Sequence, residues 1–140
     1  VFSIVLFVVK VSDMQISISS VDPEKLDNST RFNEKHRRTS VIYIAGPLYF
    51  GTANKLEEKL SEIEEKDILI FSMRGVPLAD ISGVQALERL ILRLSENNTE
   101  VYFTCVQPAV MGLFERWGMT QKVGEENFFW STDKALNQIK

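Results

Sequence analysis

Apolar and polar residues follow two different spacings along residues 41–140. Continuous runs rich in Val, Ile and Phe predict strands at 41–45, 68–71 and 101–106. Apolar positions three or four residues apart predict helices over about 52–65, 81–96 and 108–117, and a short last helix ends near residue 139. Strands that alternate with helices require crossover connections. The predicted fold is therefore α/β, with a mostly parallel sheet flanked by helices.

The ends of these helices carry recognisable capping residues. Thr52, Asp80 and Ser131 are expected as N-caps, because their side-chain oxygens accept hydrogen bonds from the first turn. Pro108 suits a first-turn position and Gly118 a left-handed position after a helix. The stripes that we expect to face the sheet are Val84, Leu87, Ile91 and Leu94 in one helix, and Val110, Leu113, Phe114 and Trp117 in the next.

The first 40 residues follow neither spacing. Val1 to Val9 are apolar apart from Ser3, and Lys10 follows them. Nine residues are too few to span a bilayer, which takes about 20 in a helix. The run therefore fits either a buried strand or the tail of a membrane helix, and the run alone favours the strand. Residues 20–40 mix both charge signs without periodicity, as in a solvated linker.

Composition excludes several classes of function. The 140 residues are 44% hydrophobic and 25% charged, as in an ordinary globular domain. The net charge of −3 disfavours nucleic acid as a partner. Cys105 and His36 are the single cysteine and histidine, which excludes an internal disulfide and disfavours a metal site. We expect Cys105 to be a buried apolar thiol and His36 a surface residue.

Sequence motifs of the common enzyme classes are also absent. The chain has no nucleophile elbow, no Walker loop, no dinucleotide fingerprint and no zinc-protease motif. We therefore predict a non-catalytic protein without cofactor or metal, and nucleotide binding is disfavoured.

The most distinctive polar segment lies where the second strand gives way to the long helix. Asp80 is placed to cap this helix, Ser82 falls in its first turn with the hydroxyl outward, and Gly83 keeps the turn uncrowded. An ordinary capped helix explains these residues. The alternative is that Ser82 is a phosphoacceptor, whose phosphate the helix dipole would favour and Asp80 would repel. The candidate partner-binding face consists of Leu78, Asp80, Ser82, Gln85, Arg89 and Leu92.

The order of short motifs resembles one family of domains. The strings are VIYIAGPLYF at 41–50 followed by Ala53-Asn54, VPLADISGV at 76–84 followed by Ala86-Leu87, PAV at 108–110, LFERWG at 113–118 and FF at 128–129. Together they resemble the STAS domain (sulfate transporter and anti-sigma factor antagonist) of SulP-type anion transporters. The resemblance implies a mixed sheet of about four strands. It also implies that 41–140 is the STAS domain, that 13–40 is a linker with a possible edge strand, and that 1–12 is the tail of the last transmembrane helix.

The resemblance also implies a function. It suggests a cytoplasmic regulatory and interaction domain at the inner membrane, whose partners are the membrane domain of the same transporter and possible cytosolic proteins. Ser82 matches the position of the phosphorylated serine of free-standing anti-sigma antagonists, and Asp80 matches their preceding aspartate. A free-standing antagonist, acting as a serine phosphoswitch, is therefore the alternative.

Overall fold

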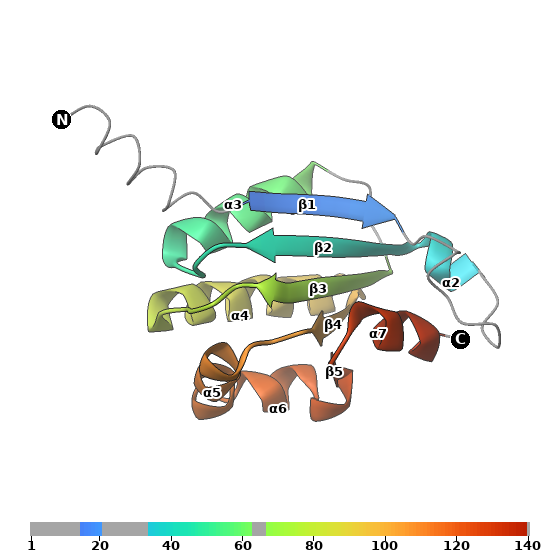
Figure 1. Cartoon of the computed structure of the whole chain (residues 1–140). Helices are drawn as coiled ribbons and strands as arrows, with labels where there is room; N and C mark the ends of the chain where they lie inside the picture. The colour runs from blue at the N-terminus through green and yellow to red at the C-terminus, as the bar shows by residue number, and fades with distance from the viewer. Residues whose placement is uncertain (1–14, 21–33, 63–66, 140) are drawn as a thin grey trace, which may run out of the picture.

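The computed structural model describes residues 15–20, 34–62 and 67–139, and they build one five-stranded sheet (Figure 1). The strands lie side by side in chain order, and β1 pairs antiparallel with β2 while the remaining pairs are parallel. They are β1 Gln15–Ser20, β2 Thr39–Ala45, β3 Ile68–Gly75, β4 Glu100–Thr104 and β5 Phe128–Phe129. The α/β class with a mixed, mostly parallel sheet is confirmed, with five strands in place of about four.

Helices occupy both faces of the sheet. They are α2 Glu34–Arg37, α3 Phe50–Ser61, α4 Ile81–Glu96, α5 Pro108–Arg116, α6 Met119–Val123 and α7 Thr132–Gln138, with a 3₁₀ turn at Glu125–Asn127. None of the helices in the described ranges is long and apolar enough to cross a bilayer. The expected membrane-helix tail at 1–12 lies outside the described residues.

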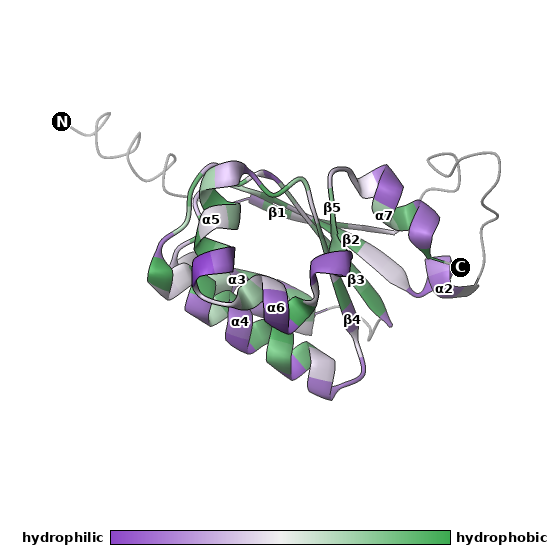
Figure 2. Ribbon diagram, turned by 90° about the horizontal axis from the view of Figure 1, so that it is seen from below, coloured by the Kyte–Doolittle hydropathy of each residue, from purple (hydrophilic) through white to green (hydrophobic). Residues whose placement is uncertain are grey.

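Side-chain alternation along the strands divides the core into two layers. Ile42 and Phe71 belong to the larger cluster, which packs against α4 and α5, whereas Val41 and Ile70 pack against α7. The central strand β3 is buried on both faces over Ile68–Met73, which explains its uninterrupted apolar run. Figure 2 shows the same arrangement, with hydrophobic strands between the helices and an alternation of hydrophobic and polar residues along α4.

The long helix matches its prediction residue for residue. Helix α4 covers Ile81–Glu96, and Val84, Leu87 and Ile91 are buried on its inner face. Other expected caps also hold: the Ser131 side chain accepts a hydrogen bond from the Lys134 amide, and Gly118 adopts a φ of +75° after α5.

Several local expectations were wrong. Helix α3 begins at Phe50, so Thr52 lies inside the first turn, where its hydroxyl donates to the Pro47 carbonyl at 3.0 Å. Trp117 is 41% exposed, because α5 ends one residue earlier and the chain turns at Gly118. His36 is fully buried against α7 and is not a surface residue.

Candidate functional site at the start of helix α4

Backbone hydrogen bonds join the loop before α3 to the loop before α4. The Leu48 amide donates to the Leu78 carbonyl at 3.0 Å, and the Asp80 amide donates to the Leu48 carbonyl at 3.1 Å. Leu48 and Val76 are both fully buried beneath these bonds. The two loops therefore form one fixed unit at the carboxyl end of β2 and β3, and this unit positions the start of α4.

Gly83 is required by a close approach of the two loops. A Cβ atom at this position would lie 2.2 Å from the Leu48 carbonyl oxygen and 2.9 Å from the Tyr49 Cα. Real side chains cannot adopt such distances. The sequence indicated an uncrowded turn, but the structure shows that the first turn of α4 packs directly against the backbone of Leu48.

Asp80 caps α4, as predicted. Its backbone is extended, with φ −110° and ψ 171°, and its Oδ1 accepts a hydrogen bond from the Gly83 amide at 2.6 Å. The carboxylate thus satisfies one of the amides that the helix itself leaves without an acceptor, and it interacts favourably with the positive end of the helix dipole.

The residues that the sequence analysis assigned to the partner-binding face are all exposed, namely Leu78, Asp80, Ser82, Gln85, Arg89 and Leu92. Four of them, Ser82, Gln85, Arg89 and Leu92, are spaced three or four residues apart and follow one side of α4; we call them the α4 strip. Leu92 is 47% exposed and is the large apolar side chain on this strip.

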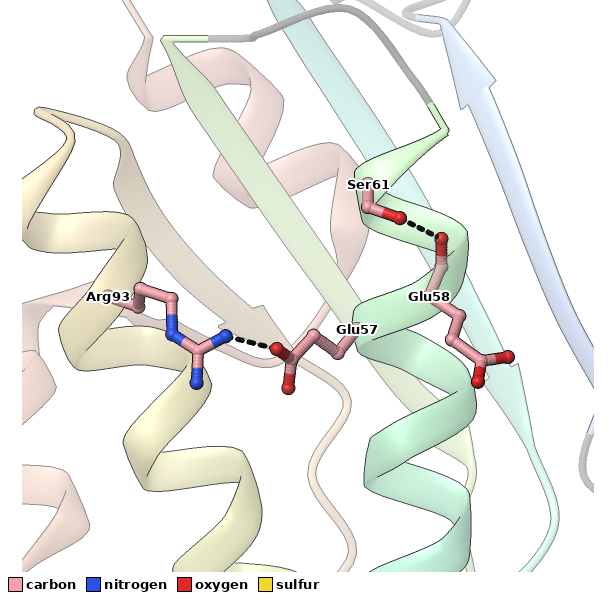
Figure 3. Close-up of polar contacts among 4 residues, drawn as sticks. All are labelled: Glu57, Glu58, Ser61 and Arg93. Carbon is pink, nitrogen blue, oxygen red and sulfur yellow. Dashed lines mark hydrogen bonds and ion pairs between the residues drawn. The ribbon is translucent and has the colours of Figure 1, made fainter.

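Two ion pairs flank the α4 strip. On one side, Arg93 pairs with Glu57 and links α4 to α3 (Figure 3). On the other side, Glu88 pairs with Lys122 and links α4 to α6. These contacts hold the helix at its edges and leave the strip between them uncovered. Figure 3 also shows the end of α3, where the Ser61 hydroxyl donates to the Glu58 carbonyl at 2.6 Å.

Three exposed apolar residues beside this site were not predicted from the sequence. Tyr49 is the N-cap residue of α3, Phe50 is its first residue, and Ile81 is the first residue of α4. All three lie at the loop unit that the hydrogen bonds of Leu48 connect. The available signal was the position of Tyr49 and Phe50 just beyond Gly46-Pro47-Leu48, at the end of a strand, where side chains are often exposed. We call Tyr49, Phe50, Leu78 and Ile81 the edge patch.

The single cysteine and histidine lie in different parts of the fold. Cys105 is half-buried, contrary to expectation, and its thiol donates to the Trp130 carbonyl at 3.2 Å. Its φ of +59° ends β4 in a left-handed conformation that few non-glycine residues adopt. His36 contacts α7 instead. Among the described residues, no group of three or more His, Cys, Asp or Glu side chains is arranged to hold a metal ion.

Comparison with known families identifies the domain. The family model described as "STAS domain" matches residues 32–135. The chain belongs to the STAS domain family. The match begins before the first residue of β2 and ends within α7, so it includes the loop unit and the whole of α4.

Transport proteins contain sequences that are similar to this STAS domain. A probable sulfate permease of Schizosaccharomyces pombe is 27% identical over 76% of this chain and 19% of its own length. A crystal structure of a sulfate transporter family protein from Wolinella succinogenes has 29% identity and a TM-score of 0.68, over 84% of this chain and 94% of that one. The chain spans about a fifth of the length of the curated relatives it matches.

Its fold is also that of anti-sigma factor antagonists. SpoIIAA in its unphosphorylated form superposes with a TM-score of 0.64 over 89% of this chain and 96% of that one, at 16% identity. At this identity the likeness concerns the fold alone. Neither the family model nor these relatives indicate an enzyme family.

Proposed function

We propose that this chain is the regulatory and interaction domain of a SulP-type anion transporter, located on the cytoplasmic side of the inner membrane. In this proposal residues 1–12 end the last membrane helix, and 41–140 form most of the domain. Residues 13–40 connect the two and add the edge strand β1 and the helix α2 to the packed domain. The sulfate permease and sulfate transporter family relatives support this assignment. In this proposal the domain acts by binding a protein partner, and it carries no catalytic residue.

The observation that carries the proposal is the uncovered α4 strip. Its residues are exposed, begin at a rigid capped helix end and combine a hydroxyl, an amide, a guanidinium and an apolar side chain. A surface that joins apolar and hydrogen-bonding groups on one fixed helix suits recognition of a protein. The partner is the membrane domain of the same transporter or a cytosolic protein.

Ser82 is proposed to control this contact as a phosphoacceptor. Its side chain is exposed in the first turn, where backbone amides and the helix dipole favour an added phosphate. Asp80 already accepts the Gly83 amide, so a phosphate would lie beside an existing carboxylate and be repelled by it. The modification would then change the charge of the strip while leaving the fold intact.

The test is anion transport by the full-length protein. Ser82→Asp is expected to alter transport or weaken partner binding, while Ser82→Ala stays near wild type. Gln121→Glu, an added charge at an exposed residue of α6, is the matched control and is expected to have no effect. Thermal melts of the three variants should agree with wild type. Wild-type transport and binding in Ser82→Asp, with a normal melt, would contradict the proposed surface.

A free-standing anti-sigma factor antagonist is the second candidate. The exposed Ser82 behind the Asp80 cap favours it, because a phosphoswitch needs an accessible hydroxyl on a stable element. The coding sequence upstream of Val1 separates the two candidates. Several hundred residues with many apolar segments of about 20 residues support the transporter, and the lack of such segments supports the antagonist.

A further inference from the structure

The edge patch and the start of the sheet lie at the same end of the molecule. Gln15, the first residue of β1, pairs with Ala45, the last residue of β2. The antiparallel β1 therefore begins at the end of the sheet at which α3 and α4 also begin (Figure 1). The 14 residues that precede Gln15 include the apolar run Val1 to Val9.

The edge patch is apolar, exposed and fixed. The exposed fractions are 40% for Tyr49, 50% for Phe50, 44% for Leu78 and 45% for Ile81. They are four of the seven large hydrophobic side chains that are exposed in the described part of the chain. The hydrogen bonds of Leu48 to Leu78 and Asp80 connect the two loops that carry them. Such clustering marks an interaction surface, since scattered single residues would need no explanation.

We propose that the edge patch contacts the surface of a lipid bilayer and so sets the orientation of the domain. The chain approaches this end of the sheet from an apolar run, which places membrane and patch on the same side if that run is membrane-embedded. Phe, Leu and Ile side chains enter the boundary between headgroups and acyl chains, and Tyr suits the headgroup region. Asp80, the cap of α4, lies next to Ile81 at the margin of the patch. This inference rests on the proposed transporter function.

The contact is expected to depend on apolar burial more than on charge. The net charge of −3 gives the chain no general attraction to anionic lipids. Vesicles of phosphatidylcholine alone should therefore bind about as well as vesicles that also contain phosphatidylglycerol. A requirement for anionic lipid would overturn the apolar contact as the source of binding.

Brominated lipids provide the test, because they quench tryptophan only at close range. The whole chain, residues 1–140, carries Trp117→Phe and Trp130→Phe as background and one reporter, either Phe50→Trp or Leu92→Trp. Leu92 is a matched control: it is 47% exposed, but it lies about 16 Å along α4 from Ile81. We expect loss of fluorescence for the Phe50→Trp reporter and none for Leu92→Trp.

Three further results would overturn the proposal: equal quenching of both reporters, no quenching of Phe50→Trp in vesicle-bound chain, or no binding of the chain to vesicles. Binding measurements give a second readout. Phe50→Ser and Ile81→Ser are each expected to weaken partition into vesicles by about tenfold, the order expected for one lost apolar contact. Leu92→Ser should leave partition unchanged. The upstream coding sequence tests the proposed transporter function separately. Failure of the bilayer contact is therefore distinguishable from failure of the transporter assignment.

Discussion

The Nε2 atom of His36 lies 3.0 Å from the carbonyl oxygen of Leu136, a residue 100 positions later in the chain. A carbonyl oxygen only accepts hydrogen bonds, so Nε2 is the donor and carries a proton. The imidazole is fully buried, and this bond ties α2 to α7 across the face of the sheet that α7 covers. The segment before β2 is therefore part of the packed domain.

Replacing His36 should destabilise the domain. His36→Ala leaves the Leu136 carbonyl without this donor and opens a cavity, and we expect a loss of about 2–4 kcal/mol in the free energy of unfolding. His36→Gln keeps an N–H donor and should lose less. Lys35→Ala, at the exposed neighbouring position, is the control and should stay within about 0.5 kcal/mol of wild type. Urea unfolding measures all three, and equal stability of His36→Ala and Lys35→Ala would show that the bond contributes nothing.

The two glycines Gly83 and Gly112 should respond in opposite directions to the same substitution. In Gly83→Ala the new Cβ meets the Leu48 carbonyl oxygen, so the loops must separate at a cost of about 1–3 kcal/mol or more. In Gly112→Ala the Cβ meets no atom within 4 Å and lies inside helix α5. Lower chain entropy in the unfolded state should then raise stability by about 0.4–1 kcal/mol. Thermal melts of both variants check the pair, and a stabilised Gly83→Ala would disprove the close approach.

Loss of the Asp80 cap should be measurable and local. Asp80→Ala removes the acceptor of the Gly83 amide and should reduce stability by about 1 kcal/mol. Asp80→Asn retains a side-chain oxygen that can accept the Gly83 amide, and it should retain most of the stabilisation that the cap provides. This variant therefore separates the contribution of the hydrogen bond from that of the charge. Hydrogen exchange of the amides in the first turn of α4 is the direct readout. Unchanged exchange in Asp80→Ala would mean that the cap does not hold this turn.

Tyr102 should make the domain less stable in alkaline solution. Burial, the hydrogen bond that the Tyr102 hydroxyl donates to Glu100 and the negative charge of Glu100 together raise the pKa of Tyr102 from 10.0 to about 12, with burial as the largest cause. Between these two values the unfolded chain loses the phenol proton while the folded chain keeps it. The stabilising contribution is therefore complete below pH 10 and disappears as the pH rises towards 12.

The check on Tyr102 is the pH dependence of chemical unfolding. Wild type should lose stability through this window more steeply than Tyr102→Phe, because the variant has no phenol to titrate. Glu100→Gln removes the charge but not the burial, and should give an intermediate slope. Identical slopes for wild type and Tyr102→Phe would contradict the raised pKa.

Local chemistry was readable from the sequence alone. The bounds of α4, its Asp80 cap, the Pro108 start of α5 and the Gly118 turn each depend on residues within a few positions of one another. The same is true of β3, whose continuous apolar run reports burial on both faces. Periodicity and capping therefore determined the order and type of most elements, and with them the α/β class.

Contacts between distant segments were decided by the tertiary structure. The burial of His36 depends on Leu136, the need for glycine at 83 depends on the Leu48 carbonyl, and the apolar edge patch forms only when the loops at 46–49 and 76–80 meet. A linear pattern records how a residue relates to its neighbours in the chain. It does not show which backbone atoms from distant parts of the sequence will lie within hydrogen-bonding or van der Waals distance once the sheet has formed.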